Sequence, residues 1–147
     1  MAKTFKVDRA RRIADRIVRS FLVLHLAPRN YYLLTTVGRK SGQPHSTPVV
    51  IIQEGSQRWL VSPFGKVGWV FNIRASGQAT LTRNGRSETV AVKELSAQQA
   101  APVLRQYVAG VVTTRQYFDV KPDSAESDYI AEAPRHPVFE IVETVAA

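Results

Sequence analysis

The chain has 147 residues, of which 44% are hydrophobic and 22% charged, and its formal net charge is +8. This composition predicts one globular domain over residues 1–147 and excludes a chain that is disordered throughout. The absence of cysteine excludes disulfides, thiolate catalysis and cysteine-ligated metals. No apolar run reaches the roughly 18 residues that span a membrane, and the start lacks the apolar region of a signal peptide. A cytoplasmic protein is therefore expected.

The positive charge is unevenly distributed along the chain. Residues 1–20 carry a net charge of +5, residues 21–93 carry +7, and residues 118–147 carry −5. Such a field favours a polyanionic partner, which would be a nucleic acid, an anionic membrane or a highly charged cofactor.

Residues 1–28 are predicted to form an amphipathic helix. Asp8 is a suitable N-cap, apolar residues recur at helical spacing up to His25, arginines occupy the other faces, and Pro28 ends the element. The helix either packs on the core or lies against an anionic membrane surface. His25 is interpreted as a packed or capping residue.

A short turn separates two apolar, β-prone runs at residues 31–37 and 47–52. It contains Gly38, Arg39, Lys40, Ser41 and Gly42. Glycine lets the backbone turn sharply, while the two cations, the hydroxyl and the loop amides can bind an anion such as a phosphate. The alternative is an ordinary hairpin tip whose charges keep it soluble.

The middle of the chain predicts a hairpin followed by a loop and a helix. Residues 49–52 are apolar on both faces and indicate a central strand, which turns at residues 54–56 and returns over residues 58–61. Trp59 is interpreted as a core residue. A loop rich in glycine and proline follows at residues 62–68, and residues 69–75 should form a short helix. On that helix Trp69, Asn72 and Ile73 share a face, which either contacts a ligand or packs against the core. Arg74 either contacts a ligand or is solvated.

The last third predicts more antiparallel strands and helices. Asn84-Gly85 favours a type I′ hairpin between residues 78–83 and 86–95. Ser96 and Gln99 form a capping box for a helix that Gly110 would end. Residues 122–131 could form a short helix, and residues 137–143 a closing strand. The pattern indicates an α+β protein, a small barrel or strongly curled sheet with attached helices.

Two motifs resemble those of the deazaflavin-dependent nitroreductase family, an actinobacterial class of oxidoreductases that use coenzyme F420. The first covers residues 34–44 (LTTVGRKSGQP) with Thr47-Pro48, and the second covers residues 69–75 (WVFNIRA). Residues 136–139 resemble the family's closing strand. His45 stands where the family usually has a second cation. The resemblance implies a split β-barrel of the pyridoxamine-oxidase-like, FMN-binding type, with residues 29–147 forming the barrel and its helices.

The resemblance also implies a site. F420, rather than FMN, would be the cofactor, and its acidic tail and phosphate would lie on the turn at residues 38–42. The implied cofactor-binding residues are Gly38, Arg39, Lys40, Ser41, Gly42, His45, Thr47, Pro48, Ser62, Phe64, Gly65, Lys66, Trp69, Asn72 and Arg74. Tyr107 and Tyr117 are candidate proton donors, and no metal is expected.

The predicted activity is hydride transfer from reduced F420 to an electron-poor small molecule: an enone or other activated alkene, a quinone or a nitroaromatic. The protein would act as a monomer or homodimer. One alternative is a split-barrel protein that binds a flavin, a lipid or a fatty acid without turnover. The other is a basic protein of nucleic acid or membrane surfaces; the cations are not interleaved with aromatics as nucleic-acid binding would favour.

Overall fold

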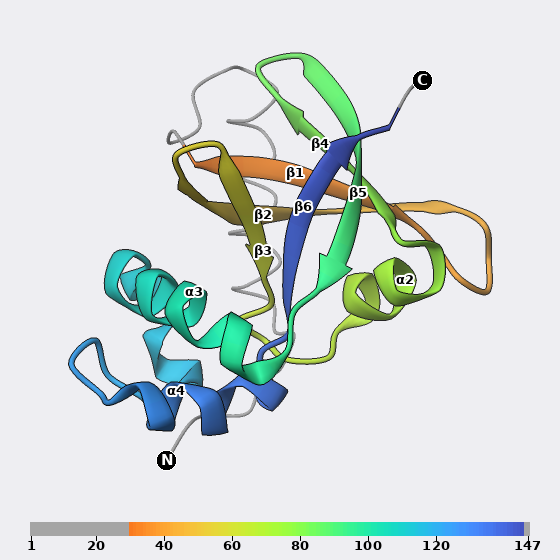
Figure 1. Cartoon of the computed structure of the whole chain (residues 1–147). Coiled ribbons are helices and arrows are strands. Elements are labelled where there is room, and N and C mark those ends of the chain that lie inside the picture. Colours follow the sequence, from red (N-terminus) through yellow and green to blue (C-terminus); the bar gives the residue numbers. More distant parts are fainter. Residues whose placement is uncertain (1–29, 146–147) are drawn as a thin grey trace.

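A closed antiparallel barrel forms the centre of the structure, a computed structural model that describes residues 30–145 (Figure 1). The predicted amino-terminal helix lies outside these residues. Around the barrel the strands follow the order β1-β2-β3-β6-β5-β4. Their bounds are β1 Tyr31–Val37, β2 Pro44–Glu54, β3 Gln57–Val61, β4 Gln78–Arg83, β5 Arg86–Glu94 and β6 Val138–Thr144. The predicted barrel with attached helices is confirmed.

Two tight turns set the register of the hairpins. Asn84 and Gly85 both have positive φ angles, 53° and 73°, and they join the paired residues Arg83 and Arg86. This is the backbone that a type I′ turn needs, as the sequence predicts. Between β2 and β3 the turn also contains a glycine with positive φ, Gly55 at 60°.

Within residues 30–145, three α-helices lie outside the barrel, and α2 and α3 are the first two. Helix α2 (Gly68–Ser76) links β3 to β4 and ends at Gly77, whose φ of 72° forms a left-handed cap. Helix α3 (Ala97–Gly110) begins with the predicted capping box of Ser96 and Gln99. Gly110 is the last residue of α3, but the cap that follows it is Val111 in an extended conformation.

The segment after α3 consists of short helices. These are η1 (Val112–Tyr117), α4 (Glu126–Glu132) and η2 (Ala133–Arg135). Helix α4 starts four residues after Pro122, where the sequence placed the beginning of a helix, and it ends one residue beyond Ala131. In Figure 1, α3 and α4 lie together at one end of the barrel, and α2 lies apart from them beside the β1–β2 turn.

Two apolar clusters hold these parts together. The first fills the barrel with residues such as Leu34, Leu60 and Phe139, and α2 closes it with Val70 and Ile73. The second lies between the outer face of the barrel and the helices α3 and α4. It contains Trp59, Val61, Val103, Leu104, Val108, Phe118 and Tyr129. Trp59 is therefore a core residue, as predicted.

Among the described residues no helix is long and apolar enough to cross a membrane.

Candidate functional site

The turn between β1 and β2 is closed by its own backbone. The amide of Gly42 donates to the carbonyl of Gly38 at 2.9 Å, and the amide of Gly38 donates to the carbonyl of Gln43 at 2.8 Å. A Cβ on Gly38 would lie 2.5 Å from Ser41 Oγ and 3.0 Å from His45 Nε2. Gly42 has a φ of 71°. Both glycines of the predicted motif are thus required by the turn itself.

Asn72 joins this turn to helix α2. Its side-chain oxygen accepts from the backbone amide of Arg39 at 3.2 Å and from Arg39 Nη1 at 3.0 Å. Its Nδ2 donates to Thr36 Oγ1 at 3.1 Å. Asn72 is only 4% exposed. A buried amide with its hydrogen bonds made restricts the groups that it contacts, so Asn72 holds Arg39 in place.

The turn presents positive charge that no carboxylate of residues 30–145 neutralises. Within residues 30–145, neither Arg39 nor Lys40 takes part in an ion pair. The Arg39 guanidinium lies 5.1 Å from the centroid of the Phe71 ring, and both side chains are exposed. An anion could therefore approach the turn and bind there.

A mostly apolar cavity of about 230 Å³ lies between the barrel wall, α2 and the segment after α3. Trp69 lines it one helical turn before Asn72, and Thr47 and Pro48 line it a few residues beyond His45. Phe64 and Tyr107 complete the predicted residues on its walls. Helix α2 and strand β2 therefore both lead from the turn to the cavity.

Sequence reasoning missed more than half of the cavity wall. The missed residues come from β1, β2, β3, the loop before α2 and the segment at the start of η1; they are Tyr31, Val49, Val50, Val61, Pro63, Val111, Thr113 and Thr114. Within that wall the hydroxyl of Thr114 donates to the Tyr107 oxygen at 3.4 Å, and both residues are buried. The local sequence of Val111, Thr113 and Thr114 carries no recognisable signal of a cavity wall. Their position depends on how residues 111–117 fold back onto the barrel.

Tyr117 approaches the cavity indirectly. Its ring packs edge-on against Phe64, with 5.1 Å between ring centroids. It does not line the cavity.

Four other predicted ligands do not line this cavity: Ser62, Gly65, Lys66 and Arg74. Lys66 and Arg74 line a separate cavity of about 250 Å³ beside the start of α3. The Arg74 guanidinium donates to both carboxylate oxygens of Glu94, at 2.9 and 2.7 Å, and this interaction raises the pKa of Arg74. Ser62 is fully buried, and its hydroxyl donates to the carbonyl of Gly65. Ser62 and Gly65 thus shape the loop that carries Phe64.

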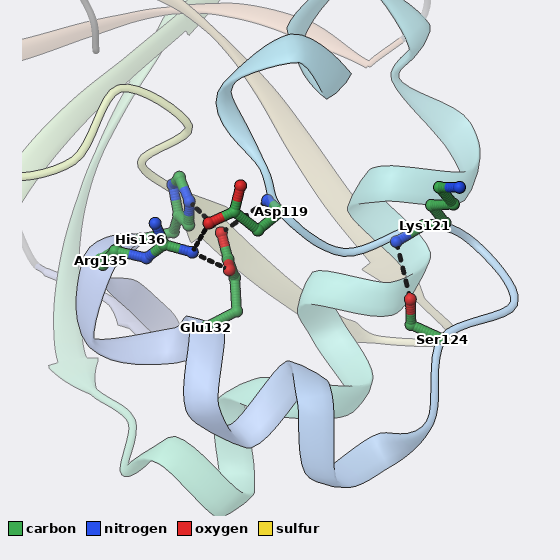
Figure 2. A network of polar contacts seen from close by, with 6 residues as sticks. All are labelled: Asp119, Lys121, Ser124, Glu132, Arg135 and His136. Carbon is green, nitrogen blue, oxygen red and sulfur yellow. Dashed lines mark hydrogen bonds and ion pairs between the residues drawn. The ribbon is translucent and has the colours of Figure 1, made fainter. Parts of the chain in front are cut away.

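A polar network around the buried side chains of Glu132 and His136 connects α4 to Asp119 (Figure 2). Glu132 of α4 is 3% exposed; it accepts from Arg135, from His136 Nε2 at 2.9 Å and from the amide of Asp119 at 3.2 Å. Arg135 also pairs with the Asp119 carboxylate at 2.8 Å. Sequence reasoning missed this network, although Glu132 and His136 stand four residues apart, a spacing that brings side chains together on a helix.

Burial lowers the pKa of His136, and its hydrogen bond with Glu132 acts in the opposite direction. A carboxylate can only accept hydrogen bonds, so Nε2 carries the proton of the ring. The lowered pKa favours the neutral ring at pH 7, and Nδ1 has no hydrogen-bond partner among residues 30–145. The ring stacks on Phe118 with centroids 3.9 Å apart.

These features fit a cofactor with a charged tail and a flat ring. The exposed cations of the turn suit a phosphodiester and an acidic tail, and the aromatic walls of Phe64 and Trp69 suit a ring system. Helix α2 contributes to both places through Trp69 and Asn72.

Solved structures of similar fold support this interpretation of the barrel. A domain-swapped dimer is 21% identical, with a TM-score of 0.58 over 90% of this chain and 96% of that one. An F420-H2 dependent reductase is 20% identical, with a TM-score of 0.55 over 78% and 95%. A pyridoxamine 5′-phosphate oxidase-related, FMN-binding protein from Nostoc punctiforme is 12% identical, with a TM-score of 0.54 over 95% and 82%. At these identities the likeness shows the fold, which is the predicted split barrel.

A comparison with curated proteins gave no match. The model of one protein family, described as F420H(2)-dependent quinone reductase, matches residues 6–122. This match contains both motifs of the sequence, the turn with Asn72 and most of the cavity wall. The predicted F420-dependent class of reductase and its cofactor are thereby confirmed, and the chain belongs to the F420H(2)-dependent quinone reductase family.

Proposed function

We propose that the protein reduces an electron-poor small molecule in the cavity, with coenzyme F420 bound across the turn and the cavity. The bound cofactor supplies a hydride. Arg39, Lys40 and Ser41 would hold its phosphate and acidic tail, and Phe64 and Trp69 would enclose its ring. The observation that carries this proposal is the double hydrogen bond from Arg39 to Asn72, because it joins the cationic turn to the helix that also lines the cavity.

The work of the protein is binding, orientation and exclusion of water. Buried and half-buried apolar side chains such as Val61 and Val111 surround the cavity. A dry site strengthens electrostatic interactions and keeps water from the reacting centre. Fixed walls hold donor and acceptor in contact, which lowers the entropic part of the barrier.

An acceptor that receives a hydride also needs a proton. Tyr107 is the candidate donor on the cavity wall, and Tyr117 is the candidate beside Phe64. A quinone, an enone and a nitroaromatic would each meet this chemistry. The description of the matching family favours a quinone among them.

Assembly and location remain proposals as well. One similar structure is a domain-swapped dimer, and we propose a homodimer for this chain, which size-exclusion chromatography with light scattering would test. A single domain, a cytoplasmic location and membrane contact through residues 1–28 stay predictions.

The first test is titration of the protein with oxidised F420, followed by tryptophan fluorescence, with FMN in parallel. We expect micromolar or tighter binding of F420 and weaker binding of FMN. A double variant, Arg39→Ala with Lys40→Ala, should bind F420 at least about tenfold more weakly, because two charge-assisted contacts are lost. The matched control is Arg86→Ala with Lys93→Ala, which removes two cations of the same barrel outside the turn and the cavity. Failure of the wild-type protein to bind F420 would refute the proposal.

The second test separates an enzyme from a carrier. Reduced F420 is mixed with catalytic amounts of protein and with menadione, cyclohexenone or a nitroaromatic, and its oxidation is followed by absorbance. Acceptor-dependent turnover supports the reductase. Binding of F420 without turnover of any acceptor would favour the carrier.

A further inference from the structure

We propose that Glu132 and His136 are positioning residues of the cavity. They would hold residues 117–119, and with them the acceptor side of the cavity, at a fixed distance from the loop of residues 62–65. The inference rests on the proposed function in one respect only: it takes the molecule positioned in the cavity to be the hydride acceptor. Asp119, Glu132, Arg135 and His136 are called the clamp below.

The clamp fixes residues 117–119 from several directions. The amide of Asp119 donates to Glu132 Oε2, and the Asp119 carboxylate accepts from Arg135, which also donates to Glu132 (Figure 2). Phe118 stacks on the His136 ring at 3.9 Å between centroids. Glu132, Arg135 and His136 therefore together hold the backbone amide and the carboxylate of Asp119 and the ring of Phe118.

Contacts between aromatic rings connect residues 117–119 to the walls of the cavity. On one side Phe118 packs against Tyr107, with centroids 6.0 Å apart, and Tyr107 lines the cavity. On the other side Tyr117 packs edge-on against Phe64, which also lines the cavity. A shift of residues 117–119 would consequently move both of these walls.

The opposite wall is anchored to the same place. The amide of Ser62 donates to the carbonyl of Pro137 at 2.9 Å, directly after His136. The loop also approaches Arg135 so closely that a Cβ on Gly65 would lie 3.3 Å from the Arg135 carbonyl. Residues 135–137 therefore hold the loop that carries Phe64, while their side chains hold residues 117–119.

A purely structural role would be served as well by apolar side chains, since buried ion pairs contribute little net stability over packed hydrophobic residues. What a hydrogen-bonded network adds is a defined geometry, because a donor and an acceptor must meet at one distance and angle. The clamp ends on both cavity walls, which is where a defined geometry affects an acceptor.

The test compares Glu132→Gln with Glu88→Gln in the full chain. Glu88 pairs with Arg58 on the barrel, outside the cavity and the clamp, so it controls for the loss of one paired carboxylate. Amide hydrogen exchange followed by mass spectrometry should show faster exchange of residues 111–120 and 62–67 in Glu132→Gln alone. Residues 36–45, which hold the anion-binding turn, should exchange as in the wild type.

Kinetics give a second readout. The KM for menadione should rise on the order of tenfold in Glu132→Gln, short of the hundredfold that a full ångström of misplacement can cost. The Kd for F420 should change less, because the turn that binds its acidic tail lies outside the clamp. Wild-type exchange in both segments, or an equal change in KM and Kd, would overturn the proposal. If the wild type fails to bind F420, the proposed function is refuted. The exchange comparison still tests whether the clamp positions residues 117–119.

A pair of variants at His136 keeps the test decisive if Glu132→Gln does not fold. His136→Gln retains a donor that can reach Glu132 but loses the ring, whereas His136→Phe retains the ring on Phe118 but loses the donor. We expect His136→Gln to restore slow exchange in residues 111–120 more fully than His136→Phe. If both variants exchange there as the wild type does, the clamp is not a positioning device.

Discussion

The β1–β2 turn and the clamp differ in whether their charged side chains are paired within residues 30–145. In the turn, Arg39 and Lys40 are exposed and have no carboxylate partner among residues 30–145. In the clamp, the buried carboxylate of Glu132 accepts three hydrogen bonds from neighbouring groups. The turn thus leaves its positive charge available for a ligand, whereas the charged groups of the clamp bind one another. This difference indicates that the turn binds and that the clamp positions.

Both regions depend on one buried polar side chain, Asn72 at the turn and Glu132 in the clamp. Buried polar groups are costly unless their hydrogen bonds are made, so each fixes the geometry of its surroundings. The following predictions test whether the two regions act separately.

The largest effect is expected for Glu132→Ala. The change leaves the part-buried Asp119 amide and the buried His136 Nε2 without their acceptor, and the loss at a buried donor costs about 1–3 kcal/mol. We expect a free energy of unfolding lower by about 3 kcal/mol in urea denaturation. Glu88→Ala, which removes a partly exposed ion pair, should cost about 1 kcal/mol or less. Equal losses in the two variants would show that the clamp contributes nothing special to stability.

A smaller effect is expected for Asn72→Ala. Arg39 loses both of its hydrogen bonds to this side chain, so the turn becomes less ordered. Affinity for F420, measured by fluorescence titration, should fall by about threefold to tenfold, which corresponds to about 1 kcal/mol. Asn72→Asp keeps the acceptor for Arg39 and should retain most of the affinity. A clamp variant such as Glu132→Gln should lower this affinity less than Asn72→Ala does, because it leaves the turn intact.

Gly42→Ala is expected to cost about 1 kcal/mol of stability, because an L-residue is strained at positive φ. Gly55→Ala in the β2–β3 turn is the matched control, since its φ of 60° imposes a similar strain. Thermal denaturation should give similar losses for the two variants. Only Gly42→Ala should weaken binding of F420; if both variants weaken it, the effect comes from general destabilisation.

The smallest effect concerns pH. Burial lowers the pKa of His136 below the ordinary value of 6.5, so the unfolded chain binds more protons than the folded one just below that pH. Stability contributed by the neutral ring is therefore present above pH 6.5 and is lost as the pH falls toward the lowered pKa. Glu132, Arg135 with its partner Asp119, and the Ser62 backbone surround the ring.

The measurement is the melting temperature between pH 7.5 and pH 5.5 for the wild type and for His136→Gln. The wild type should lose more stability than the variant as the pH falls, because glutamine does not titrate. Parallel curves would mean that His136 does not contribute to the pH dependence.

The sequence predicted most of what local interactions determine. The hairpin at Asn84-Gly85, the capping box at Ser96 and the short helix around Trp69 each depend on residues within one turn of each other. The glycine turn was predicted from its composition, and its role in one cofactor site with residues 69–75 was predicted from the resemblance to a known family. Alternation of apolar residues identified the strands, because one face of each strand must be buried.

Only the tertiary structure decided which side chains meet across long separations. Arg39 and Asn72 are 33 residues apart, and whether the asparagine contacts a ligand or the protein depends on how α2 docks on β1. Arg74 was assigned to the cofactor by its motif, yet in the fold it pairs with Glu94 beside α3. Residues 118–119 and 132–136 meet because the helices fold back over the barrel, and no local pattern specifies that docking. Local propensity determines elements, whereas the packing of the complete chain determines which polar groups must satisfy one another.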